Sequence, residues 1–306
     1  MKKLKLFKII PLIVIFMLVL SAAAYAGTWK QNNKGWWYEN PDGTWPSNTW
    51  QWIDSNNDHI AYCYYFDKNG YCLLNQRTPD NYLVSASGEW IIETVGLPQT
   101  KLVNTSGIQA DALPYMASAI YGGIKTPYFN PESDKINIDF RKKAPTPMEQ
   151  AGIFDMLLDN NYAKEYFPAF FNKYKSADYA AELNKGVYAK IFKDVFSISN
   201  IDESWNISII GINNIDASAN NSLIKENKND SAKFILSAKY YQAITPWFMV
   251  DSVTIEGGKY TVKGKLGELY INYDRFTTLP YTIVAEENPE SDLGHIAVLS
   301  IKINEN

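Results

Sequence analysis

Tryptophan is concentrated in a short N-terminal part of the chain. Seven of the nine Trp residues fall between Trp29 and Trp90, together with six Tyr residues and repeated Asn, Asp and Gly. So many large rings exceed what one small hydrophobic core needs, so some of them are expected to meet a ligand. After Gly96 the composition becomes that of an ordinary globular domain. We place the boundary in residues 96–100, where Gly and Pro punctuate the change, which gives an aromatic module at 27–95 and a second domain at 96–306.

The aromatic module repeats one pattern three times. An aromatic or β-branched triplet is followed by a short turn with Gly near its end, and then by another aromatic residue. The three copies are Trp36-Trp37-Tyr38 with Pro41–Trp45, Tyr64-Tyr65-Phe66 with Asp67–Tyr71, and Tyr82-Leu83-Val84 with Ser85–Trp90. This pattern is typical of β-hairpins. Because an isolated hairpin is only marginally stable in water, we expect successive hairpins to stack as a short β-solenoid.

These segments resemble the choline-binding repeats of cell-wall-binding surface proteins of Gram-positive bacteria. The order and spacing of short motifs carry the resemblance over residues 27–91. The motifs are residues 27–38, Asp42-Gly43-Thr44-Trp45, Asn48–Trp52, Tyr64–Tyr71, Thr78–Tyr82 and Ser87-Gly88-Glu89-Trp90. An insertion, Asp54–Tyr62, departs from the commonest repeat and leaves the number of complete sites open. The family binds choline groups on teichoic acids, or glucans in related branches, and the resemblance implies such a partner.

The resemblance also implies which rings bind the ligand. Trp29 matches the first ring of one repeat, and Trp36 or Trp37 matches its second ring. Trp50 matches the first ring of the next repeat. Trp52 with Tyr64 or Tyr65 would complete a second site.

Cation binding by aromatic faces agrees with this implication. A quaternary ammonium has no N–H to donate, so its recognition relies on rings placed around the charge. Three rings at about 0.5–2 kcal/mol each give a millimolar site, which holds a surface only when several sites act on a polymeric ligand. The alternative is that the rings only pack the hairpins together, which would make the module a stacking spacer.

Residues 1–26 have the pattern of a secretory signal peptide. Four lysines precede an apolar run at 9–20, and Ala24-Tyr25-Ala26 fits the rule for a cleavage site. The apolar run is short for a membrane span of about 20 residues, so we expect cleavage and secretion. The sequence has neither a lipoprotein Cys near this site nor a Leu-Pro-x-Thr-Gly sorting motif. Wall association is therefore expected to be non-covalent.

The net charge of the chain disfavours two classes of binding partner. Without residues 1–26 the chain has 25 Lys and Arg against 33 Asp and Glu, a formal net charge of −8. An acidic chain disfavours nucleic acid and anionic membrane surfaces as partners.

Export permits a disulfide between the two cysteines, Cys63 and Cys72, but we favour two half-buried free thiols.

The second domain is predicted to be α+β, with helices followed by an antiparallel sheet. Apolar residues at helical spacing predict helices at Asp111–Tyr121, Met148–Leu158, Tyr162–Tyr174 and Tyr179–Phe196. Alternating patterns then predict strands at Trp205–Ile212, Lys233–Ile244, Phe248–Ile255, Tyr260–Lys265, Leu269–Tyr273, Tyr281–Ala285 and Ile296–Ile303. Gly257-Gly258 predicts a hairpin turn between two of these strands.

The second domain lacks the catalytic or metal-binding residues that several classes of wall-degrading enzyme require. Its one His, His295, and its lack of Cys disfavour a zinc peptidase, a zinc amidase and a Cys–His peptidase. Carboxylate-only glycosidase chemistry survives, with Asp155 and Asp159 or Glu286-Glu287 as candidate pairs. Asp54–His59 begins like a calcium loop but lacks the Gly and Glu that such a loop needs, so we expect no metal site.

The sequence therefore predicts an exported protein that binds wall polymer through residues 27–95 and displays an α+β domain, in a binding role and without a cofactor. A wall hydrolase that uses paired carboxylates is the alternative. No family is recognised across Leu97–Asn306.

Overall fold

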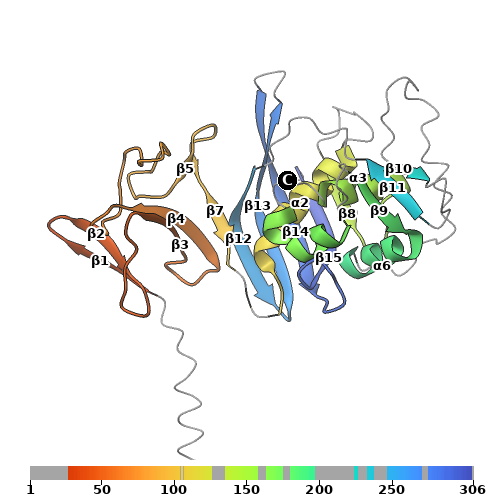
Figure 1. The fold of residues 1–306 in the computed structure, drawn as a ribbon, viewed down its shortest axis with the longest axis horizontal. Helices are drawn as coiled ribbons and strands as arrows, with labels where there is room; N and C mark the ends of the chain where they lie inside the picture. The colour runs from red at the N-terminus through yellow and green to blue at the C-terminus, as the bar shows by residue number, and fades with distance from the viewer. Residues whose placement is uncertain are drawn as a thin grey trace, which may run out of the picture. The chain divides into compact units, whose positions relative to one another are not determined.

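The structure, a computed structural model, describes residues 27–103, 105, 107–125, 135–157, 163–174, 180–196, 224–226, 233–237, 247–270 and 275–304. The chain forms two compact units (Figure 1). The first reaches to Asn57 and includes Ala61–Gln99, and the second contains Asp58–Ile60 and Thr100–Asn306. The predicted signal peptide lies outside the described residues and stays a prediction. Among the described helices, none has the length and apolar character needed to cross a membrane.

The first unit is built from short antiparallel strands. They are β1 (Thr28–Asn32) paired with β2 (Gly35–Glu39), β3 (Thr49–Ile53) paired with β4 (Ile60–Phe66), and β5 (Ile91–Ile92) paired with β6 (Leu97–Pro98). The hairpin character predicted from the aromatic triplets is confirmed, but the partner differs. The triplets in β2 and β4 pair with the strand before them, and across the following turn only single bridges form, such as Phe66 with Cys72 and Val84 with Trp90.

One turn recurs four times in the described part of the first unit. In each copy the N–H of the first residue donates to the C=O of the fifth, and the N–H of the fourth donates to the C=O of the first, over 2.7 to 3.0 Å. The fourth residue has a φ between 71° and 97°, the left-handed region that glycine adopts at least cost. The turns are Asn40–Thr44, Asp67–Tyr71, Thr78–Tyr82 and Ser85–Glu89, with Gly43, Gly70, Asn81 and Gly88 in fourth place. The glycines that predicted three of these turns therefore meet a backbone requirement.

The second unit is built on an antiparallel sheet in the order β12-β13-β14-β15-β8. Its strands are β12 (Trp247–Glu256), β13 (Lys259–Tyr270), β14 (Arg275–Glu287), β15 (Ile296–Ile303) and β8 (Ile136–Asp139). Gly257 and Gly258, with φ of 56° and 77°, form the predicted turn between β12 and β13. The mixed helix and strand composition and the C-terminal antiparallel sheet confirm the coarse fold prediction.

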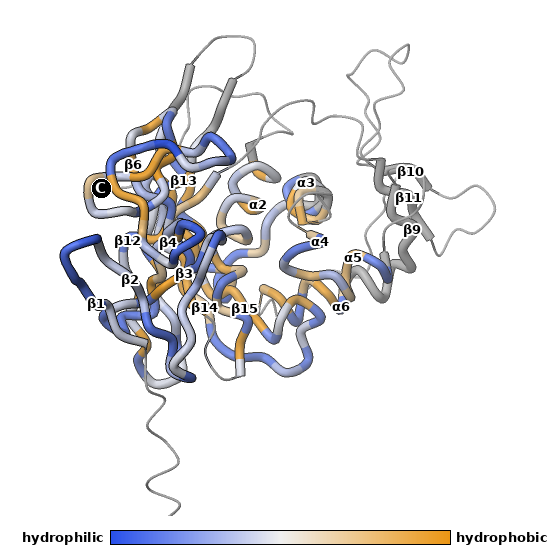
Figure 2. Tube along the Cα trace, turned by 60° about the vertical axis from the view of Figure 1, so that its left-hand side comes forward, coloured by the Kyte–Doolittle hydropathy of each residue, from blue (hydrophilic) through white to orange (hydrophobic). Residues whose placement is uncertain are grey.

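Helix α2 (Leu113–Lys125) lies in the core of the second unit. Every residue from Leu113 to Gly123 is buried, which is typical of a helix with neighbours on all sides. It packs against β12, β13 and β14 and against helix α3 (Pro147–Leu157). Figure 2 shows the hydrophobic residues gathered where α2 meets these strands, while hairpin β1–β2 of the first unit is mostly polar. A capping box between Thr146 and Glu149 begins α3 where the sequence predicts it.

Several predicted elements have different limits. The predicted helix 162–174 is divided into α4 (Ala163–Tyr166) and α5 (Pro168–Tyr174), because Pro168 cannot donate a backbone hydrogen bond. The strand predicted at 260–265 and the first two residues of the strand predicted at 269–273 belong to one strand, β13, whose Gly267 lies under the indole of Trp247. Residues 271–273 lie outside the described residues. The predicted strand 205–212 and residues 238–244 lie outside the described residues.

The helix predicted at 179–196 is wrong in its first turn and a half. Ala180–Asn184 form strand β9, and helix α6 begins at Lys185 and ends at Phe196. β9 pairs along its whole length with β11 (Lys233–Ser237), which also pairs with β10 (Ile224–Glu226). Tertiary pairing outweighs the helix propensity of Ala, Glu and Leu here. The remaining elements are β7 (Thr100–Leu102) and the short helix η1 (Ala110–Ala112).

Candidate functional site

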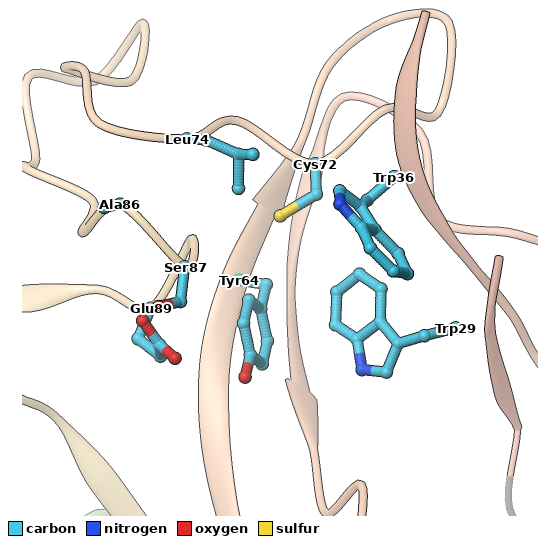
Figure 3. A pocket seen from close by; sticks show the side chains of 8 residues that line it. All are labelled: Trp29, Trp36, Tyr64, Cys72, Leu74, Ala86, Ser87 and Glu89. Atoms are coloured by element: carbon cyan, nitrogen blue, oxygen red, sulfur yellow. The ribbon is translucent and has the colours of Figure 1, made fainter. Parts of the chain in front are cut away.

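Three of the predicted rings line one pocket in the first unit (Figure 3). The pocket has a volume of about 330 Å³, which lies within the range of small-molecule sites. Its aromatic walls are Trp29 of β1, Trp36 of β2 and Tyr64 of β4. The other lining residues are Cys72, Leu74, Ala86, Ser87 and Glu89. Three separate strands and two loops therefore converge on one cavity.

Strand register explains why these rings share a face. Trp29 is paired with Tyr38, and Gln31 with Trp36, across hairpin β1–β2. Because side chains alternate along a strand, Trp29, Trp36 and Tyr38 point to one face and Trp37 points to the other. The alternation therefore places Trp36 at the pocket and Trp37 on the opposite face.

Trp29 is fixed by packing on the core of the first unit. Its ring is stacked on Phe66 at a centroid distance of 5.8 Å, and it meets Tyr64 edge to face at 4.9 Å. Its indole Nε1 donates a 3.0 Å hydrogen bond to Oγ of Ser55. These contacts fix the orientation of the ring.

Trp36 and Tyr64 differ in exposure. Trp36 is 38% exposed, whereas Tyr64 is only 8% exposed. Burial, followed by the charge of Glu89, raises the pKa of Tyr64 well above its ordinary range. Tyr64 therefore stays neutral and acts as a fixed aromatic wall, while Trp36 forms the accessible side of the pocket.

The other predicted rings lie elsewhere in the first unit. Trp37 meets Tyr71 edge to face at 6.3 Å, on the face opposite Trp36. Trp50 and Tyr65 belong to a second aromatic cluster, with centroids 5.2 Å apart, and Trp52 is an exposed residue paired with Cys63 across β3 and β4.

The second aromatic cluster contains two rings that belong to the repeat motifs but were not among the predicted ligand-binding rings. Tyr82 and Trp90 each contact the Trp50 ring, at 6.0 and 5.9 Å, and they contact each other at 5.3 Å. The Trp50 indole Nε1 donates a 2.8 Å hydrogen bond to Asp80. Both rings stand beside repeated turns, a position that could have marked them in the sequence. The seven predicted rings are thus divided between the pocket, this cluster and two separate positions.

Both cysteines are free, as expected, but they are buried rather than half-buried. Cys72 bridges Phe66 and therefore lies on the same face of β4 as Tyr64, whereas Cys63 points to the opposite face. Side chains on opposite faces of a strand do not meet the geometry of a disulfide. Burial raises the pKa of Cys63 to about 12, and burial with the charge of Glu89 raises the pKa of Cys72 to about 12.

The raised pKa values predict that both thiols are unreactive in the folded protein. A pKa of about 12 leaves roughly a thousandfold less thiolate at neutral pH than an ordinary Cys has, and the thiolate is the reactive form. At pH 7.5 we expect Ellman's reagent to modify neither Cys within minutes and to modify both at once in denaturant. Rapid stoichiometric modification of the folded protein would contradict this expectation.

The candidate carboxylate pairs gain no geometric support. Asp159 and the side chain of Asp155 lie outside the described residues. Glu286 and Glu287 are neighbours on β14, so they point to opposite faces of the sheet and do not present two carboxylates to one substrate. Within the described residues, no group of three or more His, Cys, Asp or Glu residues is arranged to hold a metal ion.

Comparisons with known proteins match only a small part of the chain. No protein-family model matches it, and no curated protein does. A solved structure of a multimodular pneumococcal cell wall endolysin from phage Cp-1, complexed with choline, is 40% identical over 21% of this chain and 18% of that chain, with a TM-score of 0.19. Two structures of the modular Cpl-1 endolysin, complexed with a peptidoglycan analogue, are 33% identical over 27% of this chain and 24% of theirs, with the same TM-score. This chain spans less than a quarter of the length of these structures.

Proposed function

We propose that the first unit binds quaternary ammonium groups, of the choline type, in the pocket formed by Trp29, Trp36 and Tyr64. The observation that carries this proposal is the convergence of three rings from three strands on one cavity of about 330 Å³. A quaternary ammonium offers only a diffuse positive charge and a shell of methyl groups, and aromatic faces satisfy both. Leu74 and Cys72 add apolar contact for the methyl groups.

The biological ligand in this proposal is a choline-bearing wall polymer, such as a teichoic acid. One cage of this kind has millimolar affinity, so a single pocket does not hold a protein on a surface. Repeated choline groups on one polymer raise the effective concentration for rebinding and for any further site. We infer that the hairpins stack as a short solenoid, and the recurrence of one turn four times along the first unit supports a repeated local geometry.

The rest of the proposal follows from the sequence. Residues 1–26 direct export, the mature protein is held on the wall without a covalent bond, and the second unit is displayed as a binding domain. Purified wall material separates this role from the hydrolase alternative, because release of reducing sugar would establish the hydrolase.

Replacing Trp36 by Ala tests the pocket directly. We expect choline affinity to fall about 3- to 30-fold, because one of three rings is lost. Retention on a choline-type matrix and elution by free choline measure the loss on the column, and saturation-transfer NMR on the choline methyl groups measures it in solution.

Trp52→Ala is the matched control. Trp52 and Trp36 have the same exposure, 38%, on strands of the same unit, but Trp52 does not line the pocket. The two substitutions therefore remove similar side chains at similar cost to folding. Equal loss of choline binding in both variants, or no loss in Trp36→Ala, would refute the assignment of the pocket.

A further inference from the structure

Glu89 is the acidic member of the pocket lining. Its side chain lies across the pocket from Trp29 and Trp36, beside the ring of Tyr64 (Figure 3). Among the described lining residues no other is acidic and none is Lys or Arg. Its charge is also free of an ion pair with any described Lys or Arg. The cavity therefore has aromatic faces on one side and an uncompensated carboxylate on the other.

The backbone holds Glu89 in this place. It is the fifth residue of the turn Ser85–Glu89, whose Ser85 N–H donates 2.8 Å to the Glu89 C=O, and it forms a bridge with Tyr64 of β4. The Ser85 hydroxyl donates to the carboxylate Oε2 and accepts the Glu89 N–H at 3.2 Å. Both the backbone and the side chain are thus fixed before a ligand binds.

The repeated turn shows that this carboxylate is a local addition. The residues in fifth place of the other three turns are Thr44, Tyr71 and Tyr82, which are all uncharged. The turn itself does not need an acid at this position. The charge of Glu89 also acts on other lining residues of the pocket. Burial is the largest cause of the raised pKa of Tyr64 and of Cys72, and the charge of Glu89 is the second.

We propose that Glu89 is the specificity-determining residue of the pocket and that its carboxylate selects a quaternary ammonium over an uncharged group of the same shape. This inference rests on the proposed function. Rings favour a trimethylammonium over a tert-butyl group through the cation–π attraction alone, since both groups fill the cavity with methyl groups. A carboxylate in a half-buried cavity adds a Coulombic attraction that only the cation gains, while a neutral ligand covers the charge without compensation.

Glu89→Gln tests the inference with two ligands. The amide keeps the size of the side chain and an oxygen that accepts the Ser85 hydroxyl, so the turn is preserved. We expect affinity for choline to fall about fivefold, the effect of one partly exposed charge pair. Affinity for dimethylbutanol, the isostere in which carbon replaces nitrogen, should stay the same or rise. Quenching of tryptophan fluorescence during titration with each ligand measures both values.

Glu93→Gln is the control for net charge. Glu93 belongs to the same unit but is paired with Arg77 at 2.7 Å and does not line the pocket, so choline affinity should not change. The inference is overturned if Glu89→Gln binds choline as the unmodified protein does, or if it loses both ligands equally. Those results leave the proposed function intact, whereas an unmodified protein that binds neither ligand refutes the function as well.

Discussion

Gly123→Ala is expected to lower the free energy of unfolding of the second unit by about 2–4 kcal/mol. A Cβ at Gly123 would lie 2.2 Å from the backbone N of Ile153 and 2.4 Å from its Cα, where helices α2 and α3 cross. Carbon contacts need about 3.5–4.0 Å, so the two backbones must separate by more than an ångström in a buried region. Alanine would otherwise stabilise a helix by about 1 kcal/mol relative to glycine, and the clash outweighs this gain.

The neighbouring glycine provides the control. Gly122 stands in the same helix, but a Cβ there meets the end of the flexible Met156 side chain at 2.7 Å. Met156 can change its rotamer, so Gly122→Ala should cost less than 1 kcal/mol or stabilise the unit. Thermal unfolding followed by circular dichroism at 222 nm reports on this unit, because the described helices all belong to it. Similar melting temperatures for the two variants would show that the crossing is not tightly packed.

Local signals predicted the parts of the fold that depend on neighbouring residues. Gly43, Gly70 and Gly88 marked turns whose fourth residue needs a positive φ, and Gly257-Gly258 marked a two-residue hairpin loop for the same reason. Apolar residues at helical spacing predicted helix α3, whose start is closed by the capping box of Thr146 and Glu149. Strand β9 could not be read in this way, because Ala180–Asn184 contains good helix formers and becomes a strand only by pairing with β11, some fifty residues later.

The aromatic character of the candidate site was predictable from the sequence, but the set of residues that line it was not. The density of Trp and Tyr predicted aromatic recognition, and Trp29, Trp36 and Tyr64 were among the candidates. Which candidates converge depends on strand register, which assigns Trp36 to the pocket and Trp37 to the opposite face. Glu89 was missed because a single acid beside a turn has many uses in a sequence. Only the folded turn places it in the same pocket as the rings.

Gly88→Ala is expected to destabilise the first unit by about 2–4 kcal/mol and to abolish measurable choline binding. Gly88 has a φ of 97°, which costs an L-residue about 1 kcal/mol or more. An added Cβ would also lie 2.8 Å from Sγ of Cys72 and 3.0 Å from Leu74, two lining residues of the pocket. The variant therefore disturbs both the pocket wall and the turn that positions Glu89.

The repeat provides a control that separates strain from packing. Gly43 holds the same place in turn Asn40–Thr44, with a φ of 79°, but no atom lies within 4 Å of a Cβ built there. Gly43→Ala should thus cost only the backbone strain, about 1 kcal/mol, and keep choline affinity. Tryptophan fluorescence during urea unfolding follows the first unit, which holds seven of the nine Trp residues. The two turns have the same pattern of hydrogen bonds. Any larger loss of unfolding free energy in Gly88→Ala therefore measures the packing of the pocket wall. Equal losses in the two variants would mean that this wall is not packed as described.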